Sequence, residues 1–173
     1  MIGGLSRLPL TALVVAVLAG NLLVACGSGS ETGSDQFRDQ TDSAILDFGE
    51  ESDEAELDEA ATAVEDFLTA RAADDWPEAC AQLSRAVLAK IEHLATTATG
   101  LADKSCPSFL GAFTELTDRE RRDSAEVDAG SLRQRERRAF LIYHGADEVV
   151  YAMPMRREGE VWKVDSLSPK RLS

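Results

Sequence analysis

The chain lacks a hydrophobic run long enough to cross a membrane. A spanning helix needs roughly 20 predominantly apolar residues, and the apolar stretch near the N-terminus is interrupted by Pro9, Gly20 and Asn21. Arg7 is the only charged residue before Cys26. A short apolar core that follows a single basic residue is typical of a secretory signal, which is removed from the mature protein. We therefore expect residues 1–25 to be a leader.

Histidine and cysteine are also scarce, with two His and three Cys in 173 residues. His93 and His144 lie far apart, and no C-x-x-C pair is present, so the chain has neither a zinc-ligand pattern nor a redox motif. The acidic residues between Glu50 and Glu59 lack the ordered spacing and sharp-turn glycine of a calcium loop. The sequence therefore predicts no metal site and no cofactor, and it contains no recognisable catalytic motif.

Positive charge is in short supply: 18 Lys and Arg face 31 Asp and Glu, for a formal net charge of −13. Loss of Arg7 with the leader makes the mature chain −14, one unit below −13. This balance argues against nucleic acid as a partner, because no basic face offsets it. It equally argues against attraction to anionic lipid.

The basic residues are unevenly placed, and many lie in the last third of the chain. A cluster falls between two expected strands: Arg133, Arg135, Arg137 and Arg138. Two interpretations remain open, a solvated loop or strand face, and a surface for an anionic partner such as a wall polymer or an acidic patch of another protein.

Residues 26–52 have the composition of a tether, rich in Gly, Ser and acid. Within them, the apolar patch 44–48 is expected either to stay with an inert tether or to dock on the domain or on a partner. The folded domain is expected over residues 53–173, a length that supports a single core.

The first half of the domain has helical signals. Asp53 with Glu56 fits a capping box, and the Asp75-Trp76-Pro77-Glu78 stretch starts a second helix. Apolar residues at helical spacing continue to Gly100, and a further helix is expected from Cys106.

The apolar period then changes to two, which predicts four strands over 125–129, 139–143, 149–155 and 161–167. The last three are expected to form an antiparallel meander, with Pro154 at an edge, a bulge or a strand end. Helices followed by an antiparallel sheet make an α+β domain.

The end of the leader, Leu23-Val24-Ala25-Cys26, resembles the lipobox of bacterial lipoproteins. The resemblance implies that the Cys26 thiol carries a diacylglyceryl group, which anchors the protein on the extracytoplasmic side of the cell membrane, since acyl chains partition stably into a bilayer. The alternatives are an ordinary secreted protein, or a single-helix anchor in which Cys26 is incidental.

Three stretches of the domain look like the nuclear transport factor 2-like family, especially secreted actinobacterial lipoproteins: AVEDFLTARAADDWPEACAQLS, the later Cys106, and GEVWKVDSLSP. The resemblance implies N-terminal helices packed across a curved antiparallel sheet of about four strands, forming a cone with a pocket at its mouth. It supports the fold more than the function, because this fold hosts isomerases, cyclases, dehydratases and binding proteins.

With Cys26 assigned to lipid, Cys80 and Cys106 remain in an oxidising compartment and allow one disulfide. A buried free thiol at Cys80 and a redox pair are the alternatives.

Relatives that transfer protons place an acid or a histidine beside a tyrosine inside the cone. The candidates by this resemblance are His144, Tyr151 and Asp66, with Glu65 as a further one. His144 directly precedes a turn, so a solvent-exposed strand end is the simpler interpretation. No base and oxyanion partner can be assembled from these residues.

Two functions are therefore expected. The first is a membrane-anchored binding or protein-interaction module that takes a protein or a small apolar ligand. The second is a cone-pocket enzyme of the isomerase, cyclase or dehydratase type, with His144 or an Asp as general base.

Overall fold

The computed structural model describes residues 41–97, 99, 103–113, 126–146 and 148–173. The leader, Cys26 and most of the expected tether lie outside these residues. The described helices are α2 (Asp42–Leu46), α3 (Glu54–Ala72), α4 (Trp76–Gln82), α5 (Arg85–Thr97) and α6 (Cys106–Phe113). The strands are β1 (Glu50–Glu51), β2 (Asp128–Arg135), β3 (Arg138–His144), β4 (Val150–Glu158), β5 (Val161–Val164) and β6 (Lys170–Arg171).

Helices α3 and α4 begin at the predicted caps. The Asp53 carboxylate accepts a hydrogen bond from the Glu56 backbone N–H at 3.0 Å, and Asp75 accepts one from the Glu78 N–H at 3.2 Å. Each bond satisfies a backbone donor that has no partner within its helix. Both predicted starts, of α3 and of α4, are confirmed. Only half of the capping box forms, however, because the Glu56 side chain turns to the sheet instead of reaching back to Asp53.

The sheet is antiparallel in all its strand pairings, and its main path is β1-β2-β3-β4-β5, with β6 beside β4. The mixed α+β class and the antiparallel meander of β3, β4 and β5 are confirmed. The expected count of about four strands is wrong, since the described residues form a curved, unclosed sheet of six. Strands β1 and β6 have two residues each, too few to produce a period-two pattern.

The first expected strand is also displaced. It was predicted over 125–129, whereas β2 runs from Asp128 to Arg135. The segment GSLRQR has only Leu132 as a fully buried side chain, so its alternation is weak. Its pairing with β3 and with β1, rather than its own apolar pattern, makes it a strand.

Pro154 lies inside β4, in register with Phe140 of β3. On the opposite side of β4, β5 pairs with residues 155–158 and β6 pairs with residues 151–152, so Pro154 falls between the two pairings. Its carbonyl accepts a hydrogen bond from the Asp165 N–H at 2.8 Å. The N–H and C=O of one strand residue point to the same side of the strand. The Pro154 nitrogen, which carries no hydrogen, therefore faces the gap between the β5 and β6 pairings.

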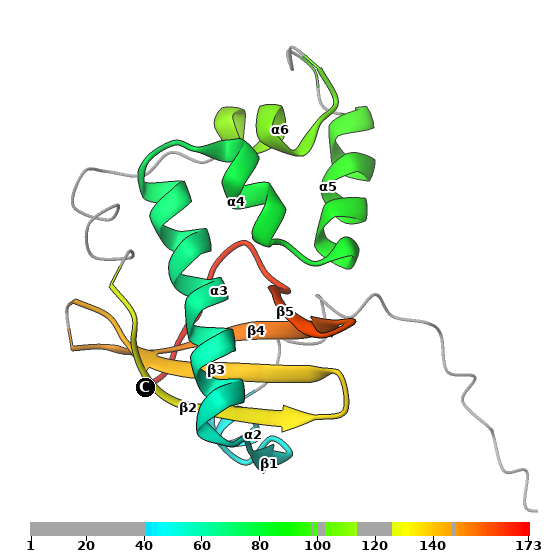
Figure 1. Cartoon of the computed structure of the whole chain (residues 1–173). Coiled ribbons are helices and arrows are strands. Elements are labelled where there is room, and N and C mark those ends of the chain that lie inside the picture. Colours follow the sequence, from blue (N-terminus) through cyan, green and yellow to red (C-terminus); the bar gives the residue numbers. More distant parts are fainter. Residues whose placement is uncertain (1–40, 98, 100–102, 114–125, 147) are drawn as a thin grey trace, which may run out of the picture.

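The two faces of the sheet are covered by different elements. Helix α3 lies across one face, and α4, α5 and α6 gather toward the β5 side (Figure 1). The main core lies under the helices and joins Phe67 and Leu68 of α3 to inward-facing strand residues: Leu132, Leu141, Met153, Met155, Trp162 and Val164. The opposite, outer face has a smaller cluster: Ile45, Phe48, Phe140, Ile142, Ala152 and Leu172.

Residues 41–51 form a clasp over this outer face. Ile45 is fully buried, Phe48 is 7% exposed, and β1 pairs with β2. The tether expected over 26–52 therefore does not extend to Ser52, because its apolar patch docks on the domain and its acidic end joins the sheet. Burial of Ile45 and Phe48 offsets the entropy cost of ordering the patch, because their transfer from water contributes roughly 1.5–3 kcal/mol per side chain.

The clasp turns into β1 at Gly49. This residue has φ of +55°, and a Cβ built on it would lie 1.9 Å from the Gln134 carbonyl oxygen. Only glycine combines this conformation with so close an approach of two backbones.

Candidate functional site

The structure does not bring the three predicted catalytic candidates together. Asp66 is exposed on α3. Tyr151 is half-buried on the helix-facing side of β4, where its ring stacks on Tyr143 with centroids 5.6 Å apart. His144 is exposed at the end of β3 and, because Tyr143 faces the helices, it faces the outer side. The described residues therefore form no base and oxyanion pair from these candidates.

One of them, Asp66, lies at a groove between α3 and β5. It has a volume of about 390 Å³, within the usual range of ligand sites. Asp66 lines it from α3. The remaining lining residues are Glu59, Thr62 and Ala63 of α3, Gln82 of α4, and Glu160, Val161, Trp162 and Lys163 of the β5 hairpin.

The groove lies off the free edge of β5. Trp162 and Val164 point their side chains into the helix-facing core, so Val161 and Lys163 point to the other face. Residues from both faces of β5 line the groove. The groove therefore sits at the edge of this strand. Val161 is 53% exposed there.

The backbone of β5 is paired with β4 on one side, and on the other side Val164 is paired whereas Trp162 is open. The Asp165 N–H bonds to the Pro154 carbonyl of β4, so Lys163 and Val161, two and four residues earlier, also face β4. Trp162 and Val164 face away from it. The Ser84 N–H donates to the Val164 carbonyl at 2.8 Å. Among the described residues, no group pairs with the backbone N–H and C=O of Trp162.

A buried polar network fixes this edge in place. Asp165 is fully buried and receives the Ser84 hydroxyl, together with a bidentate contact from Arg156, whose Nη2 lies 2.9 Å from Oδ2. Ser84 also caps α5, because its Oγ accepts from the Val87 N–H at 3.2 Å. The network joins the start of α5, the end of β5 and the middle of β4. Its partners are distant in sequence, so no sequence pattern indicated it.

A second polar contact fastens α3 to the β4–β5 hairpin. Glu56 accepts a hydrogen bond from the Trp162 indole N–H at 2.7 Å and pairs with Arg157, whose guanidinium lies 5.5 Å from the Trp162 ring centroid. The Arg157 hydrogen bond and, to a lesser degree, the Trp162 hydrogen bond lower the pKa of the Glu56 carboxyl, against the opposing effect of burial. Glu56 and Arg157 thus hold the Trp162 ring beside the groove.

Asp66 also lines a second hollow, of about 410 Å³, along α3 and the start of α4. Four carboxylates border it: Glu65, Asp66, Asp75 and Glu78. The surface of α3 that faces away from the core is therefore acidic over both hollows.

The basic cluster serves mainly the chain itself. Arg133 donates to the carbonyls of Phe48 and Gly49 at 3.3 and 3.1 Å, and the Arg135 guanidinium lies 4.8 Å from the Phe48 ring centroid. Arg137 donates to the Arg157 carbonyl at 3.1 Å. Neither interpretation of the cluster anticipated that these side chains hold the clasp and the neighbouring strand.

Arg71 has a structural role that the sequence did not indicate. It is 8% exposed in the last turn of α3, donates to the Leu167 carbonyl at 2.8 Å and lies over the Phe67 ring. Burial lowers the pKa of its guanidinium. Its position near the helix C-terminus is favourable for a cation, and the contact clips the segment after β5 to α3.

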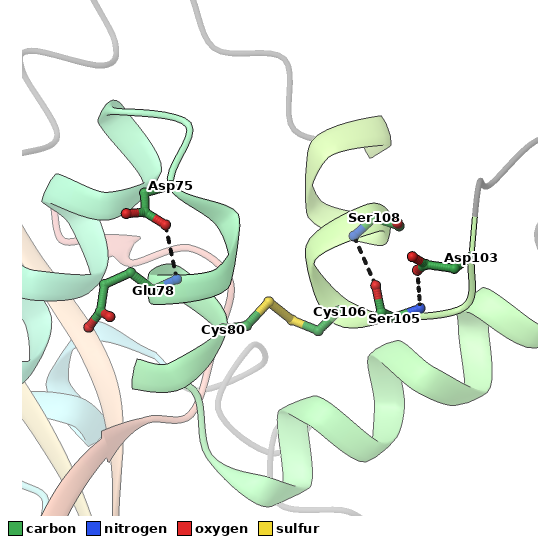
Figure 2. Close-up of a disulfide and its surroundings, with 7 residues drawn as sticks. All are labelled: Asp75, Glu78, Cys80, Asp103, Ser105, Cys106 and Ser108. Atoms are coloured by element: carbon green, nitrogen blue, oxygen red, sulfur yellow. Dashed lines mark hydrogen bonds between the residues drawn. A yellow bond between two sulfur atoms is a disulfide. The ribbon is translucent and has the colours of Figure 1, made fainter.

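Cys80 and Cys106 form a disulfide that joins α4 to the start of α6, with Cα atoms 6.2 Å apart. Figure 2 shows Cys80 on α4 facing Cys106, with the Asp75 cap on one side and the Ser105 hydroxyl accepting from the Ser108 N–H on the other. The predicted pairing is confirmed, and a free thiol or a reduced redox pair is not what the structure contains.

Across the described ranges, no group of three or more His, Cys, Asp or Glu side chains is arranged to hold a metal ion. None of the helices in that part of the chain combines the length and the apolar composition needed to cross a bilayer. No family model, curated protein or solved structure shows significant similarity to this chain.

Proposed function

We propose that the protein is a lipoprotein anchored to the cell membrane through Cys26, and that its α+β domain is a binding or protein-interaction module on the extracytoplasmic side. The observation that carries the proposal is the disulfide between Cys80 and Cys106. Disulfides persist in oxidising compartments, which fits export by the leader. The bond also uses both cysteines of the domain, so Cys26 is left for the lipid that its lipobox implies.

The membership in the nuclear transport factor 2-like family stays part of this proposal. A long helix that crosses a curved antiparallel sheet supports it. The two hollows on the α3 side supply surface for a partner, and the clasp leaves residues 26–40 between the lipid site and the folded domain.

Replacement of Cys26 tests the anchor. In cells that express Cys26→Ser, we expect the protein to leave the membrane fraction and to lose incorporation of a radiolabelled fatty acid, while the wild type retains both. The matched control is Cys80→Ser with Cys106→Ser, which keeps the lipobox and is expected to stay lipid-labelled. A Cys26→Ser protein that remains membrane-bound and labelled would refute the anchor.

The enzyme is the second candidate, and the observation that favours it is Asp66 at the α3–β5 groove. A proton-transfer enzyme would place Asp66 as general base there. The discriminating experiment uses the compound that co-purifies with the detergent-extracted wild type. An enzyme converts it, and Asp66→Asn loses conversion while keeping binding. A binding module returns it unchanged.

A further inference from the structure

The geometry points to the α3–β5 groove as the docking site of one kind of partner: an extended, positively charged peptide segment of another protein, paired as a strand to β5. This inference rests on the proposed interaction function and names the surface and the partner's chemistry.

The backbone of β5 provides the first argument. Leu83 already forms a parallel bridge with Val164 on the outer edge of the strand, so this edge accepts strand pairing. Beyond that bridge, the N–H and C=O of Trp162 face the groove without a partner among the described residues. An added strand supplies main-chain hydrogen bonds to such an edge, and hollows beside it receive its side chains.

The rigidity of this edge provides the second argument. Trp162 is 3% exposed, and Glu56 and Arg157 hold its ring, while the buried contact of Arg156 with Asp165 fixes the end of the strand. A partner that pairs with β5 therefore meets a backbone that is already ordered, which lowers the entropy cost of association.

The charge of the groove selects the partner. Three carboxylates line it, from Glu59, Asp66 and Glu160, against the single ammonium of Lys163. The Lys163 Nζ is engaged by the Ala81 carbonyl at 2.8 Å. The excess negative charge favours Lys or Arg side chains on the incoming strand and repels acidic segments. The exposed Val161 side chain offers contact to apolar residues that alternate with them.

The opposite edge of the sheet also borders an acidic hollow, lined by Glu50, Glu51 and Glu136, but this edge is held less firmly. Strand β1 has two residues, Glu50 and Glu51, and the nearby hollow includes the Arg135 side chain, which is turned onto Phe48. Strand β1 belongs to the clasp, whereas the Arg156–Asp165 contact fixes the end of β5, so β5 is the more rigid template.

Binding of a fluorescent hexapeptide of alternating Lys and Val tests the charge argument. With the full-length lipoprotein in a non-ionic detergent, we expect saturable binding that weakens as salt rises. The double variant Glu59→Gln with Asp66→Asn is expected to weaken it about fivefold to tenfold, since two exposed ion pairs with the peptide are lost and each contributes modestly. Asp58→Asn with Glu92→Gln removes the same charge from exposed sites outside the groove and is expected to leave binding unchanged.

Two further measurements test the strand pairing. Methylation of alternate backbone nitrogens of the peptide is expected to abolish binding, and hydrogen exchange of the segment that contains Trp162 is expected to slow when the unmodified peptide binds. The inference is overturned by absence of saturable binding, or by binding that survives backbone methylation or is equal in the two double variants. If the protein is anchored through Cys26 and retains a native partner but fails these tests, only the groove is refuted as the docking site. If the protein is not anchored through Cys26, the proposed function is refuted.

Discussion

The two faces of the sheet are buried by different physical means. The helix-facing side is an apolar core under α3, and the helical layer beside it is closed by a disulfide. The outer side combines a cluster of six apolar residues with the buried Arg156–Asp165 contact, and its cover is the short clasp of residues 41–51. The helix-facing side depends on apolar area and a covalent bond. The outer side depends on a short segment, which we expect to detach while the rest of the domain stays folded.

The largest expected loss of stability follows truncation of a side chain in the main core. Phe67 is fully buried, so Phe67→Ala removes a large apolar side chain and leaves a cavity, at a cost of about 3–5 kcal/mol in the free energy of unfolding. Denaturant titration followed by tryptophan fluorescence measures it. Thr69→Ala, an exposed site on the same helix, is the control. A loss below about 1 kcal/mol for Phe67→Ala would mean that the helix-facing core is not the main source of stability.

Removal of the disulfide should have the next largest effect. The bond closes a sequence separation of 26 residues, which corresponds to about 3.5 kcal/mol in the loop-entropy account. Cys80→Ala with Cys106→Ala should lower the free energy of unfolding by about this amount and leave the clasp in place. The same denaturant titration checks this, and thiol titration of the denatured, unreduced wild type should detect neither cysteine. Reactive thiols in that sample would contradict the bond.

The clasp should release locally. Phe48→Ala removes a ring whose centroid lies 5.2 Å from that of Phe140 and which also contacts the guanidinium groups of Arg135 and Arg138. We expect a global loss of only about 1–2 kcal/mol, because residues 41–51 can detach without exposing the main core. Limited proteolysis with a glutamate-specific protease should cut at Glu50 and Glu51 early in this variant. Leu46→Ala, at a residue 48% exposed in the same clasp, should stay as resistant as the wild type. Equal resistance of Phe48→Ala would show that the clasp does not depend on this ring.

The smallest expected effect concerns Asp42. Hydrogen bonds from the Ser173 side chain and backbone, followed by the contact with Lys170, lower the pKa of Asp42 from 3.8 to about 2. A carboxyl whose pKa is depressed by folding contributes stability above about pH 4, and that contribution is lost as pH falls toward 2. Asp42→Asn should therefore differ slightly from the wild type in melting temperature at pH 7, and the two should converge near pH 2. A difference that grows on acidification would contradict this assignment.

The sequence predicted those parts of the fold that depend on neighbouring residues. The aspartate caps of α3 and α4 act within three residues, and strands β3 and β4 have continuous apolar patterns, so both could be recognised locally. The α+β class and the antiparallel meander of β3, β4 and β5 followed from these local patterns. Strand β1 was not predictable in this way, because two acidic residues become a strand only when Gln134 and Arg133 of β2 provide partners.

The candidate site was predicted less well, for the same reason. Asp66 was a candidate because of its type, and the groove that it lines depends on Trp162, about a hundred positions later in the chain. Glu56 fitted a local capping box, yet its carboxylate is used by Arg157 and Trp162. Local patterns identify which side chains are polar, but they do not show which distant groups will compete for them.

The contact between Asp42 and Ser173 brings the start of the described domain next to its end. If the protein is anchored through Cys26, a mechanical load on the anchor enters the domain at Thr41. That load first meets the Asp42 contacts, then α2, and then the two-residue β1, which can be peeled from the sheet edge one hydrogen bond at a time. Under such a load we expect the clasp to detach before α3 is pulled, which would leave the main core intact.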